Sequence, residues 1–325
     1  MLAAQRKFEN GPQRQKRVVF RNILLASDYS ASANLAMPYA AGMARSFGAK
    51  LYAMHVQEPI NYALPPATWQ GLELTREMEE KFLVEAIRRD FPEVHPHVLH
   101  AEGVVWRAIE AAIQKHEIDL VVVGTRGRTG IEKALLGSVA EEILRHAPCP
   151  VLTVGPQACH EAGRRGRMAS ILFATDFGKA SLTAAPIAVS LAEEYQAKLT
   201  LLHVKEKRAA GQTPGDAAGP CGAAEKCEQR LRALVAEEAK LWCEPHFVVD
   251  CGGADRGSMQ RAGAAWERIL GQAQAREADL IVMGVHDAES FPLAGAASHL
   301  ETATVHGVVA HAQVPVLTVR GGENL

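Results

Sequence analysis

The feature that most constrains this chain is an internal duplication. Residues 22–56, NILLASDYSASANLAMPYAAGMARSFGAKLYAMHV, align without a gap with residues 170–204, SILFATDFGKASLTAAPIAVSLAEEYQAKLTLLHV, at a constant offset of 148. Two later blocks match in the same order, 106–124 with 266–284 and 146–154 with 311–319. Because similarity at a fixed period identifies repeated structural units, we predict two copies of one domain.

The duplication divides the 325 residues into two domains, a number that fits this length. We expect a first domain over residues 18–156 and a second over 169–320, joined by the linker QACHEAGRRGRM at 157–168. Residues 1–17 are polar and basic, which predicts a flexible N-terminal tail. The second copy carries an extra stretch rich in Gly, Ala and Pro at 207–226, which is typical of a flexible loop.

Short apolar runs alternate with helical segments in each copy. In the first copy we expect strands near 20–26, 50–57, 95–101, 119–124 and 150–154, and helices near 31–47, 70–90, 104–117 and 138–147. Continuous apolar runs such as LVVV predict parallel strands that helices cover on both faces. The expected fold class is therefore α/β, with two tandem doubly wound five-stranded parallel sheets. If the strand order is 3-2-1-4-5, the first and fourth strands are neighbours.

The composition argues against several classes of function. The formal net charge is -2 and the pI is near 6.7, so the basic surface that binds nucleic acid or an anionic membrane is not expected. No apolar stretch approaches the roughly 18 residues that span a bilayer, and the N-terminus lacks the apolar core of a signal peptide. The six cysteines include no CxxC pair, and Cys221 and Cys227 are expected to be solvated thiols. We therefore expect a reduced, cytoplasmic protein.

One loop has the composition of a ligand site. The sequence GTRGRTGIEKALLGS, over residues 124–138, is longer than the roughly two to six residues of an ordinary strand-to-helix connection. Gly124 ends the strand, Gly127 follows after two residues, and nine more residues lead to Gly137 and Ser138. Glycines allow a ligand to approach backbone N–H groups because no Cβ stands in the way.

The end of this loop predicts a phosphate site. Ser138 opens the helical stretch SVAEEILRHA, and Glu141 three residues later completes a capping-box signature. A helix N-terminus offers unpaired N–H groups and a partial positive charge, and both favour a bound phosphate. Cationic side chains in the loop would add to this attraction, at Arg126, Arg128 and Lys133.

Asp28 ends the first strand, at the edge of the sheet where doubly wound folds bind ligands. A carboxylate repels a triphosphate unless a cation lies between them. Three roles therefore stay open for Asp28. It accepts hydrogen bonds near a base or ribose, it takes part in a water or Mg²⁺ site, or it caps the following helix.

These features resemble the universal stress protein family. The chain is similar to a tandem universal stress protein over roughly 20–155 and 169–320, and its first copy matches the motif Gly-x2-Gly-x9-Gly-[Ser/Thr] of ATP-binding members in full. The resemblance implies that ATP is bound between the fourth strand and the last helix. It assigns Asp28 and Val56 to the adenine or ribose, Gly124 to the turn, and Gly127, Gly137 and Ser138 to the phosphates and ribose.

The second copy departs from this motif. Asp287 stands where the first copy has Gly127, and no register restores a Gly-Ser pair at the helix start, where Ala297-Ser298, Thr302 or Ala303 would stand. Because a carboxylate repels a triphosphate, we expect the second copy to bind ATP poorly and to act as a structural partner. Each copy ends in a VLTV strand whose edge needs covering. In this family those strands commonly pair between subunits, so the copies could pair within one chain, or two chains could form a homodimer.

The sequence shows a nucleotide site without catalytic machinery. Walker A, Rossmann GxGxxG and GxSxG patterns are absent, and the His95 and His97 pair has no third metal ligand at a recognisable spacing. The leading hypothesis is an ATP-binding regulator of the stress response. The alternative is a slow ATPase or adenylyl-transfer enzyme that uses the same phosphate site. A ligand-free interaction scaffold is a third reading.

Overall fold

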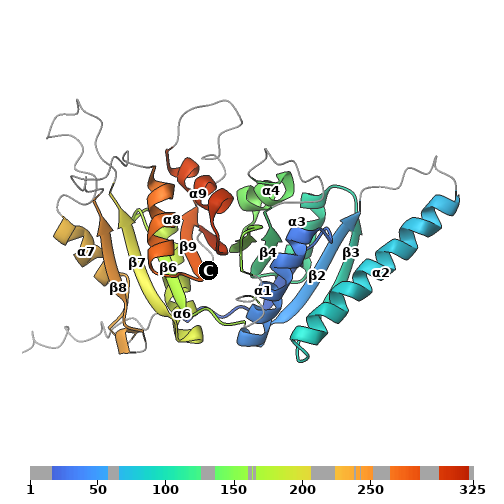
Figure 1. The fold of residues 1–325 in the computed structure, drawn as a ribbon, viewed down its shortest axis with the longest axis horizontal. Helices are drawn as coiled ribbons and strands as arrows, with labels where there is room; N and C mark the ends of the chain where they lie inside the picture. Colours follow the sequence, from blue (N-terminus) through green and yellow to red (C-terminus); the bar gives the residue numbers. More distant parts are fainter. Residues whose placement is uncertain are drawn as a thin grey trace, which may run out of the picture.

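The computed structural model describes residues 17–57, 66–125, 136–159, 163, 166–205, 224–237, 239–241, 243–251, 264–285 and 300–321. Strands and helices alternate along both halves (Figure 1). The first half contains β1 (Asn22–Ala26), α1 (Ala31–Phe47), β2 (Lys50–Gln57), α2 (Pro66–Asp90), β3 (His97–Glu102), α3 (Val105–Lys115), β4 (Leu120–Gly124), α4 (Ser138–His146) and β5 (Val151–Val154). The expected strands and helices agree with these bounds to within a few residues.

The second half repeats the same succession. It contains β6 (Ser170–Ala174), α6 (Lys179–Tyr195), β7 (Lys198–Val204), α7 (Ala224–Ala233), a 3-10 turn η1 (Ala239–Leu241), β8 (His246–Asp250), α8 (Ala265–Ala275), β9 (Leu280–Val285), α9 (Leu300–His311) and β10 (Val316–Arg320). The expected loop at 207–226 ends earlier than predicted, because α7 already begins at Ala224.

All ten strands form one sheet, in the order β3-β2-β1-β4-β5-β10-β9-β6-β7-β8. Each half has the doubly wound order 3-2-1-4-5, so the α/β fold class is confirmed. Every strand pair is parallel except β5 with β10, which is antiparallel with Leu317 opposite Leu152. Of the two pairings considered for the terminal strands, the structure therefore contains the one within a single chain.

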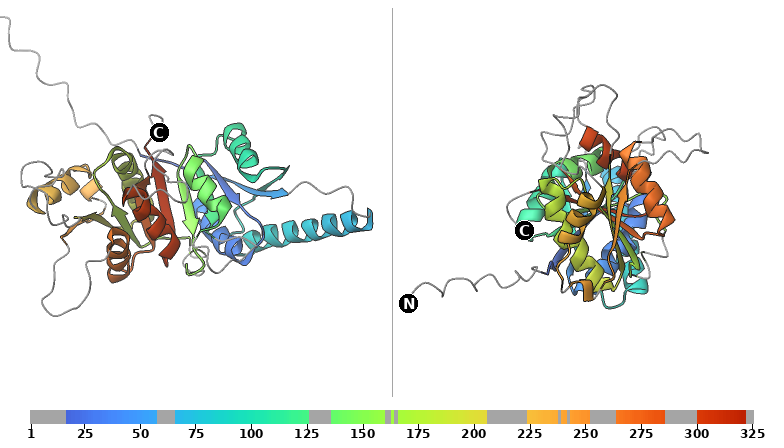
Figure 2. Two further views of the ribbon diagram at one scale, coloured as in Figure 1. Left: turned by 90° about the horizontal axis from the view of Figure 1, so that it is seen from above. Right: turned by 90° about the vertical axis from the view of Figure 1, so that its left-hand side faces the viewer.

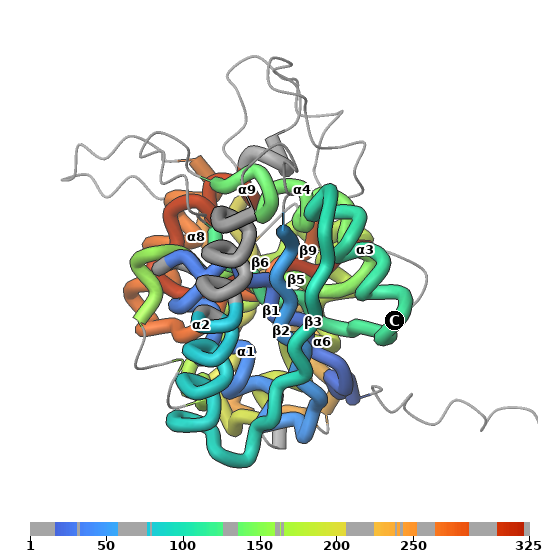
Figure 3. The backbone as a smooth tube through the Cα atoms, turned by 90° about the vertical axis from the view of Figure 1, so that its right-hand side faces the viewer, coloured from blue at the N-terminus to red at the C-terminus, as the bar shows by residue number. Residues whose placement is uncertain are grey.

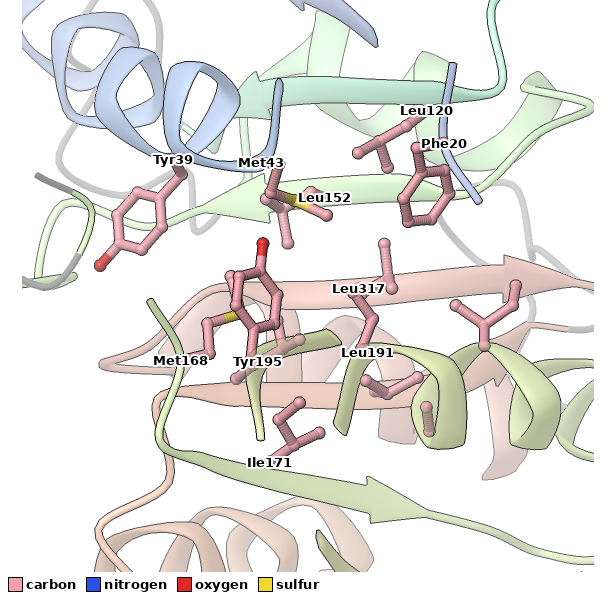
Figure 4. Close-up of a cluster of buried hydrophobic side chains, with 14 of the residues drawn as sticks. Phe20, Tyr39, Met43, Leu120, Leu152, Met168, Ile171, Leu191, Tyr195 and Leu317 are labelled. Atoms are coloured by element: carbon pink, nitrogen blue, oxygen red, sulfur yellow. The ribbon is translucent and has the colours of Figure 1, made fainter. Parts of the chain in front are cut away.

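Hydroxyl groups and apolar side chains close the junction between the halves. Thr153 Oγ1 donates to the Val316 carbonyl at 3.1 Å, and Thr318 Oγ1 donates to the Val151 carbonyl at 3.2 Å. Both threonines are buried, so these hydrogen bonds satisfy polar groups that water does not reach. Figure 4 shows apolar side chains of both halves meeting here, among them Met43, Leu152, Leu191, Tyr195 and Leu317.

Arg320, at the end of β10, reaches across the junction into the first half. Its guanidinium donates to the carbonyls of Leu144 at 2.7 Å and Ala147 at 3.2 Å, and also to that of Arg145, at the C-terminal end of α4. A cation at this end of a helix satisfies unpaired carbonyls and complements the helix dipole. The aligned residue of the first half is Gly155, which has no side chain to return the contact.

Helices cover both faces of the sheet. Successive side chains of a strand point to opposite faces. Ile23 and Leu25 of β1 belong to the core on the face covered by α1, α2, α6 and α7, whereas Leu24 belongs to the core on the face covered by α3, α4, α8 and α9. Figure 3 shows this layering for the first half, with α1 and α2 on one side of the strands and α3 on the other. In Figure 2, α2 extends well beyond the sheet. Among the described helices, none combines the length and apolar character needed to cross a membrane.

The described part of the linker packs against α1. Tyr39 donates its hydroxyl to the Cys159 carbonyl at 2.7 Å, and Ser46 donates to the Gly166 carbonyl at 3.2 Å. Gly42 lies at the closest approach, where an added Cβ would stand only 2.7 Å from the Gly166 Cα. At its far end α1 stops at Gly48, whose φ of 60° is the left-handed helix cap that glycine favours.

The prediction for Cys227 was wrong. This residue lies on α7 rather than in a solvated loop, and its side chain is completely buried in the core. Its sulfur takes part in a disulfide, so it is not a free thiol. Periodicity places Cys227 on the inward face of α7 together with Leu231, four residues later, and this spacing is the signal that composition alone concealed.

Candidate functional site

Three strands of the first half bring the predicted site residues to one edge of the sheet. β1 pairs in parallel with both β2 and β4, so the carboxyl ends of the three strands lie together. Asp28 follows the end of β1, Val56 is near the end of β2, and Gly124 is the last residue of β4. This is the edge at which doubly wound sheets bind ligands.

Backbone hydrogen bonds bring the two ends of the glycine-rich loop together. Thr125, directly after β4, donates its N–H to the Val154 carbonyl at 2.9 Å. Its own carbonyl accepts the N–H of Gly137 at 2.7 Å, so Gly137 and Ser138 return to the tip of β4. Residues 126–135 lie outside the described part of the chain, and they include Gly127 and the three cationic loop residues.

The start of α4 differs from the predicted capping box. Gly137 is the N-cap, with φ -71° and ψ 146°, and Ser138 is the first helical residue. Glu141 therefore lies one position too far along to bond the N-cap N–H, which Thr125 already binds. Instead, Glu141 accepts a hydrogen bond from Arg145 at 2.9 Å. Gly137, the N-cap, has no side chain that could cap α4, so the first amides of this helix have no N-cap side-chain acceptor.

Asp28 belongs to a tight turn before α1. Its carboxylate accepts the N–H of Ser30 at 3.0 Å, and the Ser30 hydroxyl in turn accepts the N–H of Ala33 at 3.2 Å. Ser30 is the N-cap of α1, so the reading of Asp28 as the helix cap was wrong. The two ligand-directed roles stay predictions.

The comparisons with known proteins all identify the same family. The family model described as "Universal stress protein family" matches residues 20–155 and 168–320. The chain belongs to the universal stress protein family. A universal stress protein of Methanocaldococcus jannaschii is 31% identical over 158 residues, which are 47% of this chain and 93% of that protein.

Solved structures agree with this family. A universal stress protein from Archaeoglobus fulgidus has a TM-score of 0.65 and 20% identity, over 93% of this chain and 98% of that chain. The likeness therefore shows a shared fold along nearly the whole length of both. A family member from Arabidopsis thaliana, solved with AMP bound, is 22% identical over 42% of this chain and 91% of its own, with a TM-score of 0.31.

In this universal stress protein an aromatic residue with a left-handed backbone conformation directly follows each of two aspartates, Asp28 after β1 and Asp176 after β6. Tyr29 has a φ of 60° and Phe177 a φ of 63°. A non-glycine residue in this region costs about 1–3 kcal/mol, and such residues cluster at functional sites. Here a hydroxyl two residues earlier offsets part of the cost. Ser27 accepts the N–H of Tyr29 at 3.1 Å, and Thr175 accepts that of Phe177 at 2.9 Å.

A histidine packs against each of these rings. The Tyr29 and His55 rings are 4.7 Å apart, and the Phe177 and His203 rings are 4.6 Å apart. Each histidine also hydrogen-bonds through Nδ1 to a backbone carbonyl just after a strand. His55 pairs with the Ser27 carbonyl and His203 with the Thr175 carbonyl, both at 2.8 Å. Sequence reasoning used His55 and His203 only to align the copies and missed the ring pairs. The signal was available, because an aromatic residue and a histidine recur at the same offset in both copies.

The two aspartates differ in their surroundings. Asp176 Oδ1 accepts the N–H of Gly178 at 2.7 Å and the hydroxyl of Ser181 at 2.6 Å. Ala33 aligns with Ser181, so the first half has no hydroxyl at this place. In the second half the N-terminus of α6 also packs directly onto β9, because an added Cβ at Gly284 would stand 2.3 Å from the Ser181 nitrogen. The aspartate at the second strand end is therefore engaged by protein groups of its own half.

The described residues around these strand ends contain no ready-made metal centre. No group of three or more His, Cys, Asp and Glu side chains in the described part of the chain is arranged to hold a metal ion. A cation here would therefore depend on oxygen atoms from a ligand in addition to Asp28, as Mg²⁺ sites on nucleotides commonly do.

Proposed function

We propose that this universal stress protein binds one ATP per chain, in its first half, and acts in the cytoplasm as a nucleotide-dependent regulator of the stress response. The observation that carries the proposal is the complete glycine motif of the first copy, next to a helix N-terminus whose N-cap is a glycine without a capping side chain. Uncapped amides and the helix dipole favour a phosphate group. The hydrogen bond from Gly137 to Thr125 supports this role because it returns the loop to the strand tip.

Each predicted site residue has a role in this proposal. The phosphates and ribose contact Gly127, Gly137 and Ser138, and Gly124 shapes the turn that carries the chain out of β4. Asp28 and Val56 flank the adenine or ribose at the neighbouring strand ends. Asp28 is also the carboxylate that would bind a nucleotide-bound Mg²⁺, directly or through water. The role of the bound nucleotide is to supply charge and hydrogen-bond acceptors that order this edge of the sheet.

The second half acts as a structural partner in this proposal. Asp287 would place a negative charge where the first copy has Gly127, and charges of like sign repel. Asp176 already accepts two hydrogen bonds from its own half, which supports the same assignment. The second half instead supports the first through the pairing of β10 with β5 and through the hydrogen bonds of Arg320.

Calorimetric titration of the intact chain with ATP and with AMP tests the proposal. We expect about one ATP per chain and at least a tenfold loss of affinity in Gly137→Val, because the new side chain blocks the approach of a phosphate. Gly137 has a φ of -71°, a backbone conformation that valine also adopts, so the substitution adds no backbone strain at this position. Asp287→Asn is the matched control and leaves the first site unchanged.

Two results would count against the proposal. Two ATP per chain would show that the second half also binds, and equal affinity in Gly137→Val would show that α4 is not the phosphate site. Chromatography of nucleotide released from the denatured, freshly purified chain adds a further distinction. Mostly ATP supports a regulator that holds its ligand, whereas ADP or AMP that accumulates with time and disappears in Gly137→Val supports the slow ATPase or adenylyl-transfer alternative.

A further inference from the structure

A cavity of about 500 Å³ opens in the second half, where the strands of that half begin. It lies where β6, β7 and β8 begin, next to the C-terminal end of α8. Its lining is formed by Ser170, Lys198, Thr200, His246, Phe247, Val248, Ala275 and Arg276. This volume falls within the roughly 300–1,000 Å³ of small-molecule sites.

Two permanently charged side chains, Lys198 of β7 and Arg276 directly after α8, line the cavity together with His246 of β8. Neither Lys198 nor Arg276 forms an ion pair with another described residue. Arg276 donates to the side chain of Gln272, which fixes its position without neutralising its charge. The carboxylate of Asp279 lies close by, but it is occupied by the N–H groups of residues 169 and 170, at 2.7 and 3.0 Å.

Three features reduce the positive potential of this cavity. The C-terminal end of α8 contributes about half a negative charge, Glu277 follows Arg276 directly in the chain, and Asp279 keeps its charge although its Oδ2 accepts two backbone N–H groups. Lys198 and Arg276 line the cavity itself, whereas Glu277 and Asp279 are not among its lining residues. The hydroxyls of Ser170 and Thr200 lie among these groups, and the Ser170 hydroxyl donates to the Arg276 carbonyl at 3.1 Å.

The first half shows how the same place is filled in the other copy. Tyr52, which aligns with Thr200, stacks on His97 with ring centroids 5.3 Å apart and contacts the ring of His116 at 4.8 Å. The strand register aligns His97 with His246, since these residues pair with Tyr52 and Thr200 respectively. In the second half a threonine replaces the central ring, and Arg276 replaces the histidine at 116. In the first half the rings of Tyr52 and His116 form an aromatic plug. The cavity of the second half lies where a hydroxyl and a guanidinium stand in place of these two rings.

We propose that this cavity binds a small phosphate monoester. The planar guanidinium of Arg276 matches two phosphate oxygens, and Lys198 supplies a second charge for a dianion. The Thr200 hydroxyl donates to a remaining oxygen, and the apolar side chain of Val248 contacts the organic part of the ligand. A monocarboxylate carries half the charge and fewer acceptors, so it binds more weakly.

Calorimetry with phenyl phosphate as the probe tests the cavity, at low ionic strength because salt screens such contacts. We expect saturable binding to the intact chain, an affinity at least about tenfold lower in Arg276→Gln, and loss of binding in Thr200→Tyr, which restores the plug of the first copy. His116→Gln, at the aligned position of the first half, is the matched control and keeps the affinity. Phenylacetate serves as the carboxylate probe and binds at least about tenfold more weakly.

Phosphate could also bind at α4, so every titration is repeated in Gly137→Val. Binding that persists there and is lost in Arg276→Gln supports the cavity, whether or not the chain binds ATP. Equal affinity in Arg276→Gln and Thr200→Tyr, with both variants folded by circular dichroism, would place the ligand elsewhere and overturn the proposal. Absence of saturable binding up to about 10 mM probe, or equal binding of phenylacetate, would overturn it as well.

Discussion

The strained residue beside each strand-end aspartate is repeated in both halves, although only the first half keeps the glycine motif. Tyr29 and Phe177 both have positive φ and both contact a histidine ring. A feature that served only the ligand would have no reason to persist in a half that has lost the motif. We infer that the ring pair first of all fixes the turn between β1 and α1, and that a ligand exploits a turn already fixed.

The stability of the second half depends on pH through His203. Burial lowers the pKa of His203 below its ordinary value of 6.5, and the positive charges of Arg230 and Lys205 act in the same direction. The hydrogen bond to Thr175 and the charge of Asp176 oppose this shift without cancelling it. The unfolded chain therefore binds more protons than the folded chain as the pH falls below about 6.5, and the stability from this group is lost over that range.

Urea unfolding at about pH 7.5 and about pH 5.5 measures this effect. We expect the free energy of unfolding to be lower at the acidic pH, and the difference to shrink in His203→Gln, which keeps a side-chain N–H near the Thr175 carbonyl but does not titrate. An identical pH dependence in the variant would show that other groups account for the loss. Imidazole chemical shifts of His203 give the direction of its pKa independently.

At the level of helices and strands, local sequence determined most of what was predicted correctly. Apolar runs placed the strands, and the helix expected near 31–47 is α1, which ends where Gly48 adopts a left-handed conformation. The start of α4 at Ser138 was predicted correctly, but its capping was not, because the N-cap is Gly137, which is held by a contact distant in sequence, its hydrogen bond to Thr125. The capping-box pattern at Ser138 and Glu141 contains no information about that contact.

The surroundings of two glycines inside helices predict opposite effects of a substitution by alanine. Gly42→Ala on α1 should destabilise the protein by about 1–3 kcal/mol, because the new Cβ would stand 2.7 Å from the Gly166 Cα in the linker backbone. Gly271→Ala on α8 should instead stabilise it by about 0.5–1 kcal/mol, since no atom lies within 4 Å of that Cβ. Chemical denaturation of both variants measures the two signs. Stabilisation by Gly42→Ala would mean that the linker can move away from α1.

Across the whole molecule, the halves support each other unequally. Arg320 binds three carbonyls at the end of α4, whereas Gly155 at the aligned position has no side chain that could make such a contact. The helix whose N-terminus is the proposed phosphate site is thus held at its other end by the second half. Loss of the motif in the second copy and retention of Arg320 fit the proposed division into a binding half and a supporting half.

Arg320→Ala tests this support. We expect a loss of about 1–3 kcal/mol in unfolding free energy, because the carbonyls of Leu144 and Ala147 lose a charged donor. Hydrogen exchange of the α4 amides should become faster than that of α3. Arg107→Ala removes an exposed surface pair with Glu110 and is the control, with an expected change below about 1 kcal/mol. Equal effects of the two substitutions would contradict a special role for Arg320.

Some features of the candidate site and of the whole molecule could be predicted from the sequence, and others could not. The glycine spacing and the strand ends were enough to gather Asp28, Val56, Gly124, Gly137 and Ser138 at one edge, and the strand pairing places them there. The cavity of the second half could not be predicted, because the exchange of Tyr52 for Thr200 becomes a cavity only when the flanking side chains are known not to fill it. The pairing of the terminal strands within one chain was equally open, because a VLTV strand is the same in either arrangement.

The antiparallel pairing of β5 with β10 changes how the molecule responds to dilution. Strands on separate chains meet less often as the protein is diluted. The halves that carry β5 and β10 belong to one chain and are joined by the linker at 157–168, so these two strands meet at an effective concentration on the order of millimolar. Their junction should therefore persist at the few copies per cell at which a partnership of two separate chains would dissociate. A cell could hold this protein at very low abundance and still keep every copy assembled.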